Sequence, residues 1–308
     1  MALDYFPSDS FFTCPSLRRS GMEDALSETQ SLSSMKKTTL MASIGAMAFG
    51  VTTPELIAGD WGKAPVDKTP IEECLDLGGE ISVGYETDYV FYGVRFAGDS
   101  VWTDVNYTFD NLAVPVTVGA WYLNGINGGG PSYDELDLYI DLSLGTFAGF
   151  DFNLGYYHYT FPEFRSNVTP SGGYGEAYLD ISRSLGFVDV AYSAIQSFGG
   201  AGTSSGWFHE LGLEKSFELC DKAAIVLGAG VGYSDGYYTA VLGGAPDSGW
   251  NHYYAKASLP IELNCRTTLT PYIGYNGATS GMIADGIDVG LGPQSDILHG
   301  GVSLTVSF

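Results

Sequence analysis

The sequence has few charged residues, and few of those are basic. Only 16% of its 308 residues are charged, and 13 lysines and arginines stand against 36 aspartates and glutamates, which gives a formal net charge of −23. Such a chain repels phosphate backbones, which excludes nucleic acid as a partner. Helical membrane anchors are also missing from the expected mature chain, because no run of about 18 apolar residues follows Ala58.

Cysteine is scarce as well. The residues are Cys14, Cys74, Cys220 and Cys265, and none belongs to a CxxC motif or to a Cys/His pair with metal-ligand spacing. The sequence therefore indicates neither a metal site nor a cofactor. Cys220 and Cys265 fall in two predicted turns and could be bridged if their Cα atoms lie within ~7 Å, which the sequence leaves open.

Glycine and aromatic residues are abundant instead. The chain has 42 glycines, 21 tyrosines and 17 phenylalanines. This mixture is poor in helix formers and suits pleated, half-buried surfaces. It is typical of barrels, in which glycine allows bends and tyrosine lies at the membrane interface.

The region near the start of the chain has the layout of a secretory signal peptide. In residues 35–58, Lys36 and Lys37 precede an apolar run from Leu40 to Val51, and Ala58 offers a cleavage point. A run of about 12 residues is too short to span a bilayer. A short buried helix is the alternative.

The boundaries follow from this interpretation. Residues 1–34 precede an internal methionine and are expected to be a mis-called start or an extension. Residues 59–79 are expected to form a periplasmic N-terminal segment, and residues 80–308 a transmembrane β-barrel.

From Glu80 onward, apolar and polar residues alternate with a period of two. In residues 134–145, leucines and an isoleucine alternate with Glu135, Asp137, Asp141 and other polar residues, so a strand would have one apolar and one acidic face. About 12 such segments occur, and counts of ten and fourteen stay open. We therefore predict an all-β fold, a closed antiparallel transmembrane β-barrel. The segments are 80–95, 100–110, 113–124, 134–145, 148–161, 174–185, 187–198, 206–219, 223–235, 249–264, 267–278 and 296–308.

The links between these segments differ on the two sides. Every second link is short, such as Thr146-Phe147 and Cys265-Arg266, whereas most of the others are longer and rich in Gly, Pro and Ser. The link at 96–99 is a short exception on the long side. Tight periplasmic turns and long outer loops are typical of outer-membrane barrels.

The last segment resembles the C-terminal insertion signal of bacterial outer-membrane barrels. His299, Gly301, Leu304 and Val306 fill that pattern, and Phe308 supplies the terminal aromatic residue. The resemblance implies an outer-membrane location, a periplasmic C-terminus, contact with outer-membrane lipid and recognition by the barrel-assembly machinery. The alternative is an ordinary amphipathic strand at the end of a soluble protein.

Residues 87–94 read TDYVFYGV. This stretch resembles the Thr-Asp-Tyr-x-Phe-Arg-Gly-Val opening strand of a family of outer-membrane barrels without an assigned activity. Tyr92 stands where that family usually has arginine, so a role of that arginine does not carry over. The resemblance implies a barrel and not a particular activity.

Polarity predicts which strand faces meet lipid. An ionised side chain at mid-bilayer costs ~2–4 kcal/mol, so the charged sets should face the lumen. A ring of acids would favour cations in a pore, although the acids could also serve only to wet the lumen. The predicted lumen-lining residues are Glu86, Asp88, Asp104, Asp137, Asp141, Asp180, Asp189, Glu210, Glu214, Lys256 and Glu262.

Arg183, His209 and Lys215 share the phase of apolar residues and are expected to be tolerated only near strand ends, where long side chains reach the interface. No Ser/His/Asp spacing indicates a catalytic site, so we expect no enzyme. The expected function is a passive pore for small polar solutes, and the acids of the lumen would favour cations among them. A plugged structural or binding barrel and a lipid-modifying barrel enzyme are the alternatives.

Overall fold

The computed structural model describes residues 77–127, 133–162, 173–199, 205–243 and 248–308. The predicted signal peptide at 35–58, the preceding residues 1–34 and most of the segment 59–79 lie outside the described residues.

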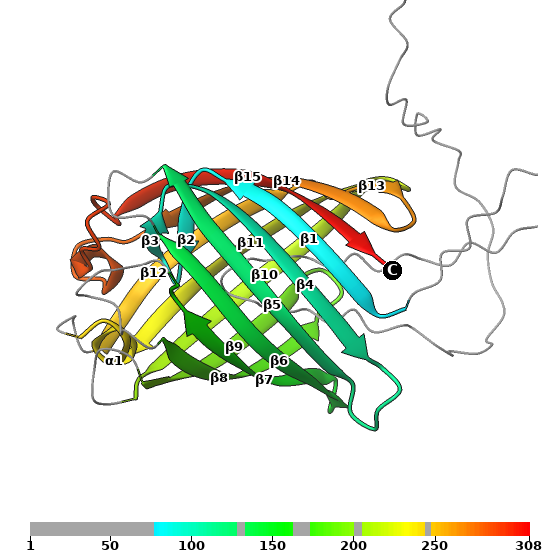
Figure 1. The fold of residues 1–308 in the computed structure, drawn as a ribbon, viewed down its shortest axis with the longest axis horizontal. Helices are drawn as coiled ribbons and strands as arrows, with labels where there is room; N and C mark the ends of the chain where they lie inside the picture. The colour runs from blue at the N-terminus through cyan, green and yellow to red at the C-terminus, as the bar shows by residue number, and fades with distance from the viewer. Residues whose placement is uncertain (1–76, 128–132, 163–172, 200–204, 244–247) are drawn as a thin grey trace, which may run out of the picture.

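Twelve antiparallel strands form a closed barrel, as the alternation predicts (Figure 1). Closure comes from β1, which pairs with β4 on one side and with β15 on the other. The strands, in their order around the barrel, are β1 (Gly79–Glu86), β4 (Asp99–Phe109), β5 (Val116–Asn127), β6 (Asp134–Phe147), β7 (Phe150–Thr160), β8 (Tyr174–Ser184), β9 (Asp189–Gly199), β10 (Trp207–Cys220), β11 (Ala223–Asp235), β12 (Ser248–Ser258) with its continuation β13 (Ile261–Asn264), β14 (Thr267–Gly277) and β15 (Asp296–Ser307).

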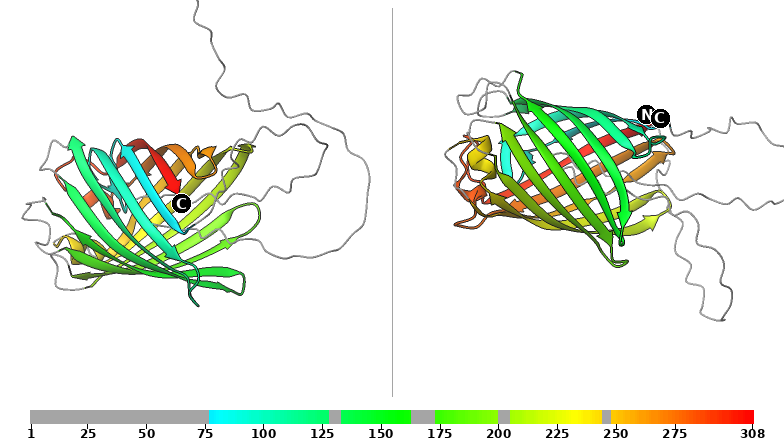
Figure 2. Two further views of the ribbon diagram at one scale, coloured as in Figure 1. Left: turned by 45° about the vertical axis from the view of Figure 1, so that its right-hand side comes forward. Right: turned by 90° about the horizontal axis from the view of Figure 1, so that it is seen from below.

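The two ends of the barrel differ. Glu80 pairs with Ser307, so the start of β1 and the C-terminus lie at one end, here called the terminal end. The links at this end are short, such as 148–149 and 221–222. At the opposite far end the links are longer, such as 236–247 and 278–295 (Figure 2). The sorting of links predicted from the sequence is therefore confirmed.

The polarity of the wall is the reverse of that in a soluble β protein. On β6, Leu138 and Ile140 are 52% and 39% exposed on the outside, whereas Asp137 and Asp141 are only 5% and 3% exposed. The same alternation exposes large apolar side chains on the other wall strands except β8, where Leu179 and Ile181 are half-buried. A barrel with an apolar exterior and a polar interior suits lipid around it and polar groups within it.

The first predicted segment, 80–95, is wrong in its second half. The wall strand β1 ends at Glu86, and the chain then forms a hairpin of β2 (Tyr89–Phe91) and β3 (Val94–Ala97) inside the barrel (Figure 1). Its turn residues, Tyr92 and Gly93, have φ values of 47° and 78°. A two-residue turn with two positive φ angles reverses the chain tightly, which a continuous strand cannot do.

This hairpin also explains the short link at 96–99, which was an artefact of the overlong first segment. The link between β1 and β4 runs from residue 87 to residue 98 and is long, like the others at the far end. The segment 249–264 is interrupted as well, because Pro260 has no backbone N–H for the ladder. The remaining segments differ from the observed strands by a few residues at their ends.

Two short helical segments lie in far-end links, α1 (Tyr237–Val241) and the 3₁₀ turn η1 (Ala284–Gly286). None of the helices among the described residues is long and apolar enough to cross a membrane.

The sequence leaves open a bridge between Cys220 and Cys265. In the structure Cys265 is disulfide-bonded, and Cys220 does not take part in that bond.

Candidate functional site

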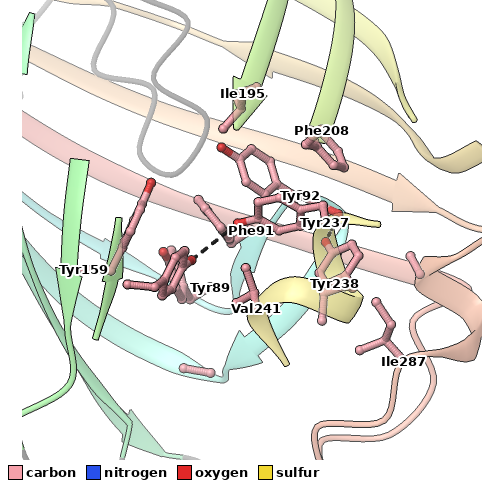
Figure 3. Packing of buried hydrophobic residues seen from close by; sticks show 14 of the residues in the cluster. Tyr89, Phe91, Tyr92, Tyr159, Ile195, Phe208, Tyr237, Tyr238, Val241 and Ile287 are labelled. Atoms are coloured by element: carbon pink, nitrogen blue, oxygen red, sulfur yellow. Dashed lines mark hydrogen bonds between the residues drawn. The ribbon is translucent and has the colours of Figure 1, made fainter. Parts of the chain in front are cut away.

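The lumen near the far end contains a cluster of buried apolar side chains (Figure 3). They come from the β2–β3 hairpin, from α1, from the residues around η1 and from the surrounding wall. Tyr89, Tyr237 and Tyr238 are each 1% exposed. We call the hairpin, α1 and η1 together the plug.

The hairpin contacts the wall on opposite sides. The ring of Tyr89 lies 5.5 Å from that of Trp121 on β5, and Phe91 meets Tyr159 on β7 at 5.8 Å. On the other side, Tyr92 stacks on Phe208 of β10 at 4.3 Å.

The turn of the hairpin is held equally closely. A Cβ atom on Gly93 would lie 2.4 Å from the ring of His252 on β12, so only glycine fits there. The carbonyl of Tyr92 accepts hydrogen bonds from Asn251 Nδ2 at 2.5 Å and from the Tyr238 hydroxyl at 2.7 Å. Since β7 and β12 are five strands apart in the ring of twelve, the hairpin spans the lumen from wall to wall.

A buried carboxylate ties the parts of the plug together. Glu176 on β8 is 1% exposed and accepts hydrogen bonds from Tyr92 of the hairpin at 3.0 Å, from Tyr159 of the wall at 2.9 Å and from Tyr237 of α1. Burial raises the pKa of the Tyr237 hydroxyl well above its usual value, so this group stays protonated and donates. Hydroxyl groups from the hairpin, the wall and α1 therefore converge on one carboxyl group, which makes Glu176 the polar contact that joins the plug to the wall.

Arg95 fastens the hairpin to the link between β14 and β15. Its backbone N–H donates to Gln294 Oε1 at 2.8 Å, and its guanidinium donates to the carbonyl of Leu291 and to Asp88 Oδ1 at 3.1 Å. Asp88, which the sequence predicts to line the lumen, thus forms an ion pair with Arg95 of the hairpin.

Below the plug, tyrosines lie across glycines of the neighbouring strand and reach acids two strands away. Tyr139 on β6 crosses Gly119 on β5 and donates to Asp104 on β4 at 3.0 Å. A Cβ atom on Gly119 would lie 2.2 Å from Cζ of that ring, so a bare glycine is what lets the tyrosine lie flat.

The same arrangement recurs around the wall. We call these arrangements tyrosine–glycine–acid triads. They are Tyr139–Gly119–Asp104, Tyr178–Gly155–Asp141, Tyr254–Gly230–Glu210 and Tyr272–Gly301–Glu86, with hydrogen bonds of 2.8–3.0 Å. In each, a tyrosine hydroxyl donates to a carboxyl group that is less than 9% exposed. The triads therefore shield the acids, and their tyrosine rings lie flat against the wall and do not project into the lumen.

The other predicted lumen residues have various surroundings. Asp137 and Asp180 are each 5% exposed, and they lie close to Glu135 and Ser193, respectively. Lys256 lies over the ring of Tyr272, with Nζ 4.3 Å from the centroid.

Three acids are less buried. Glu214 on β10 stands directly opposite Asp189 on β9, at half-buried positions, and Glu262 lies on β13 near the terminal end. A solute-lining role for any of the predicted residues stays a prediction.

Two important acids were not among the predicted residues. Glu135 has the phase of Asp137 and Asp141, and Glu176 has the phase of Asp180, so alternation alone could have identified both. The tyrosines that bind Glu176 gave no such signal, because they lie as much as 84 residues away from it in the sequence.

The histidines are dispersed. His209 contacts the Tyr192 hydroxyl at 2.9 Å on the outer face, His252 contacts Asn251 at 2.9 Å, and His299 contacts Asn276 at 3.0 Å. In the described part of the chain, no group of three or more His, Cys, Asp or Glu side chains could hold a metal ion.

The residues of the predicted insertion signal lie on β15 and at the C-terminus. Gly301 and His299 are on its inner face, and Leu304 and Val306 are on its outer face. The ring of Phe308 lies against Gly79, and the two backbones exchange hydrogen bonds of 3.0 and 2.9 Å. Recognition of this segment during insertion stays a prediction.

No family model and no curated protein matches the sequence. Among solved structures, an outer-membrane channel from Pseudomonas putida F1 is 13% identical, with 82% of this chain and 100% of that chain covered and a TM-score of 0.47. The KdgM porin is 10% identical, with 74% and 99% covered and a TM-score of 0.45. The NanC porin is 9% identical, with 75% and 100% covered and a TM-score of 0.45. At these values the function has to be argued from the lumen itself.

Proposed function

We propose that the protein is a bacterial outer-membrane barrel whose lumen is closed near the far end by the plug. The apolar outer face and the polar inner face support the membrane location, since a barrel with this polarity would expose its large apolar side chains to water elsewhere. The contact of one hairpin with β5, β7, β10 and β12 carries the proposal of closure.

The size of the buried aromatic surface indicates that closure is the stable state. Burying one large apolar side chain contributes about 1.5–3 kcal/mol. The hairpin alone buries Tyr89, Phe91 and Tyr92, so expelling it would cost on the order of 5–9 kcal/mol before any hydrogen bond is counted. An equilibrium of this size leaves the lumen open in a very small fraction of molecules. The protein then acts as a plugged structural or binding barrel unless a partner moves the hairpin.

A passive pore for small polar solutes is the second candidate. Its support is the polar inner wall below the plug, where Asp189 and Glu214 are half-buried and Lys256 lies close to Glu86. Acids outnumber bases on this wall, so a passage opened there would favour cations.

Planar-bilayer recording of the purified barrel tests both candidates. The wild-type protein is expected to be silent. A variant in which residues 88–98 are replaced by Gly-Ser-Gly is expected to show stepwise, cation-selective conductance. The double variant Phe91→Ala/Tyr92→Ala keeps the hairpin length and should conduct intermittently.

Heat-dependent migration in SDS gels checks that each variant is a folded barrel. Stepwise conductance of the wild-type protein would contradict closure and favour the passive pore. Silence of a folded hairpin-replaced variant would contradict the pore and leave a barrel without transport.

A lipid-modifying enzyme is the least supported alternative, because His209, His252 and His299 contact Tyr, Asn and Asn side chains in three separate places. Release of fatty acid from phospholipid by the purified barrel would restore it. We also infer that the terminal end faces the periplasm and that the assembly machinery inserts the chain through the segment ending at Phe308. Protection of a C-terminal epitope from protease on intact cells tests this orientation.

A further inference from the structure

Two basic side chains lie on the outer face of the barrel at its terminal end. Arg183 is the second-last residue of β8. Lys215 on β10 directly follows Glu214, which pairs with Asp189, the first residue of β9. Asp180 on β8 and Glu214 on β10 point inward. Arg183 and Lys215 are an odd number of residues away from them along the same strands, so both point outward. They therefore meet the membrane near its interface and not in the lumen.

Neither cation has an acidic partner within the described part of the chain. The ion pair found in that part joins Arg95 to Asp88. Lys215 Nζ donates to the carbonyl of Gly186 at 3.4 Å, which uses one of its three protons. Arg183 has its Cζ 4.9 Å from the ring centroid of Phe150, a contact that leaves its N–H donors at the exposed edge.

The lack of acidic partners is notable in a chain with a net charge of −23. Acids are close in the sequence, but strand alternation places Asp180, Asp189 and Glu214 on the inner face, behind the wall. An anion that binds Arg183 and Lys215 on the outer face would therefore come from outside the chain.

The two cationic groups lie near one turn. Arg183 pairs with Val190, which pairs with Leu213, two residues before Lys215. Lys215 reaches the turn between β8 and β9 at Gly186, while Arg183 leans towards β7. With strands ~4.8 Å apart, the two groups lie within about two strand spacings, on the order of 10 Å. A lipid headgroup can contact both.

The surface around them suits acyl chains. Phe150, Leu185, Phe187 and Phe217 are 38%, 47%, 72% and 49% exposed at the same end of the barrel. Basic side chains level with a headgroup and apolar ones beside them are what an anionic lipid requires.

We propose that Arg183 and Lys215 form a binding site for the phosphate of an anionic lipid, whose acyl chains lie over Phe150 and Phe217. The site rests on the proposed membrane location. The phosphate can belong to a glycerophospholipid or to lipid A. A periplasmic terminal end places the site in the inner leaflet, which selects the glycerophospholipid.

Native mass spectrometry of the detergent-purified full-length protein tests the site, with phosphatidylglycerol, phosphatidylcholine and lipid A added separately. One basic residue near a charged lipid surface corresponds to about a fivefold change in affinity, so the two together correspond to about 25-fold. We expect the wild-type protein to retain phosphatidylglycerol about 25-fold better than phosphatidylcholine. Arg183→Gln and Lys215→Gln should each reduce this preference about fivefold, and the double variant should abolish it. The matched control is Lys222→Gln, which removes a cation from a terminal-end turn without touching the site.

Equal retention of phosphatidylglycerol and phosphatidylcholine by the wild-type protein would overturn the site, as would a loss of preference in Lys222→Gln as large as that in the double variant. Retention of lipid A above phosphatidylglycerol, lost in the double variant, would support the phosphate site and overturn the periplasmic placement of the terminal end. Because conductance is recorded separately, failure of the lipid site leaves the proposed closure untouched.

Discussion

Tyrosine is used in two different ways in the plug and in the wall below it. In the plug, rings pack against one another, as Tyr92 does on Phe208 at 4.3 Å, and three hydroxyls converge on Glu176. In the wall, Tyr139 lies flat over Gly119, and its hydroxyl meets Asp104. Tyrosine therefore fills the lumen where its neighbours are aromatic, and it lies flat against the wall where its neighbour is glycine.

The difference shows that aromatic content alone does not say whether a barrel of this size is open. An eight-stranded barrel is filled by its own side chains and a sixteen-stranded one holds a channel, so twelve strands lie between the two. In this chain the β2–β3 hairpin occupies the lumen near the far end, and the proposal of closure rests on its contacts with the wall. The following substitutions test the contrast between plug and wall, and unfolding free energies in denaturant from lipid vesicles measure each one.

Phe208→Ala should have the largest effect, because it removes a fully buried ring of the wall on which Tyr92 of the plug stacks. Such a truncation costs about 3–5 kcal/mol. The matched control is Leu213→Ala on the same strand, where the side chain is 48% exposed on the outer face and should lose less. Equal losses for the two variants would mean that the plug is no better packed than the lipid-facing surface.

Glu176→Gln should come next, since it replaces a carboxyl oxygen that accepts from tyrosine hydroxyls with an amide NH₂ group that cannot accept. A buried hydroxyl left without its partner costs about 1–3 kcal/mol, and we expect a loss of about that size together with brief conductance steps. Glu218→Gln, at an exposed position on β10, is the control and should change neither quantity. A variant as stable and as silent as the wild-type protein would show that Glu176 does not hold the plug.

Gly119→Ala tests the wall. The added methyl group would lie 2.2 Å from the ring of Tyr139, so the ring must leave its position over the strand at a cost of about 1–3 kcal/mol. A Cβ atom on Gly228 would have the carbonyl oxygen of Leu213, 3.8 Å away, as its nearest neighbour, so Gly228→Ala should be nearly neutral. Adding Tyr139→Ala to Gly119→Ala should cost less than the sum of the two single effects, and strict additivity would contradict the contact.

Tyr178→Phe should have the smallest effect of the lumen variants. It removes one hydrogen bond of 2.8 Å to Asp141 and leaves the ring over Gly155 in place, which costs about 1 kcal/mol. Tyr192→Phe removes the comparable bond to His209 on the outer face and should cost less than about 0.5 kcal/mol. A larger loss at Tyr192 would mean that the outer face contributes more to stability than the triads do.

Much of the barrel could be predicted because its signal is local. Each strand carries its own alternation, so Leu138 and Asp137 identify the two faces of β6 without reference to any other strand. Glu176 could have been predicted in the same way from the phase of Asp180. The triads could not, because pairing Tyr139 with Asp104 requires the register of three strands, and register depends on all the turns between them.

The sequence by itself determined the inward and outward faces of the wall strands, because apolar and polar residues alternate with a period of two along each strand, and the positions of Gly, Pro and Ser determined the sorting of the links. The tertiary structure alone decided that residues 87–98 fold into the lumen and contact the wall on opposite sides. An aromatic residue such as Tyr92 can lie against lipid or against other rings with similar ease. The choice depends on Phe208, Tyr159 and Tyr237, which the closed barrel brings together from distant parts of the chain.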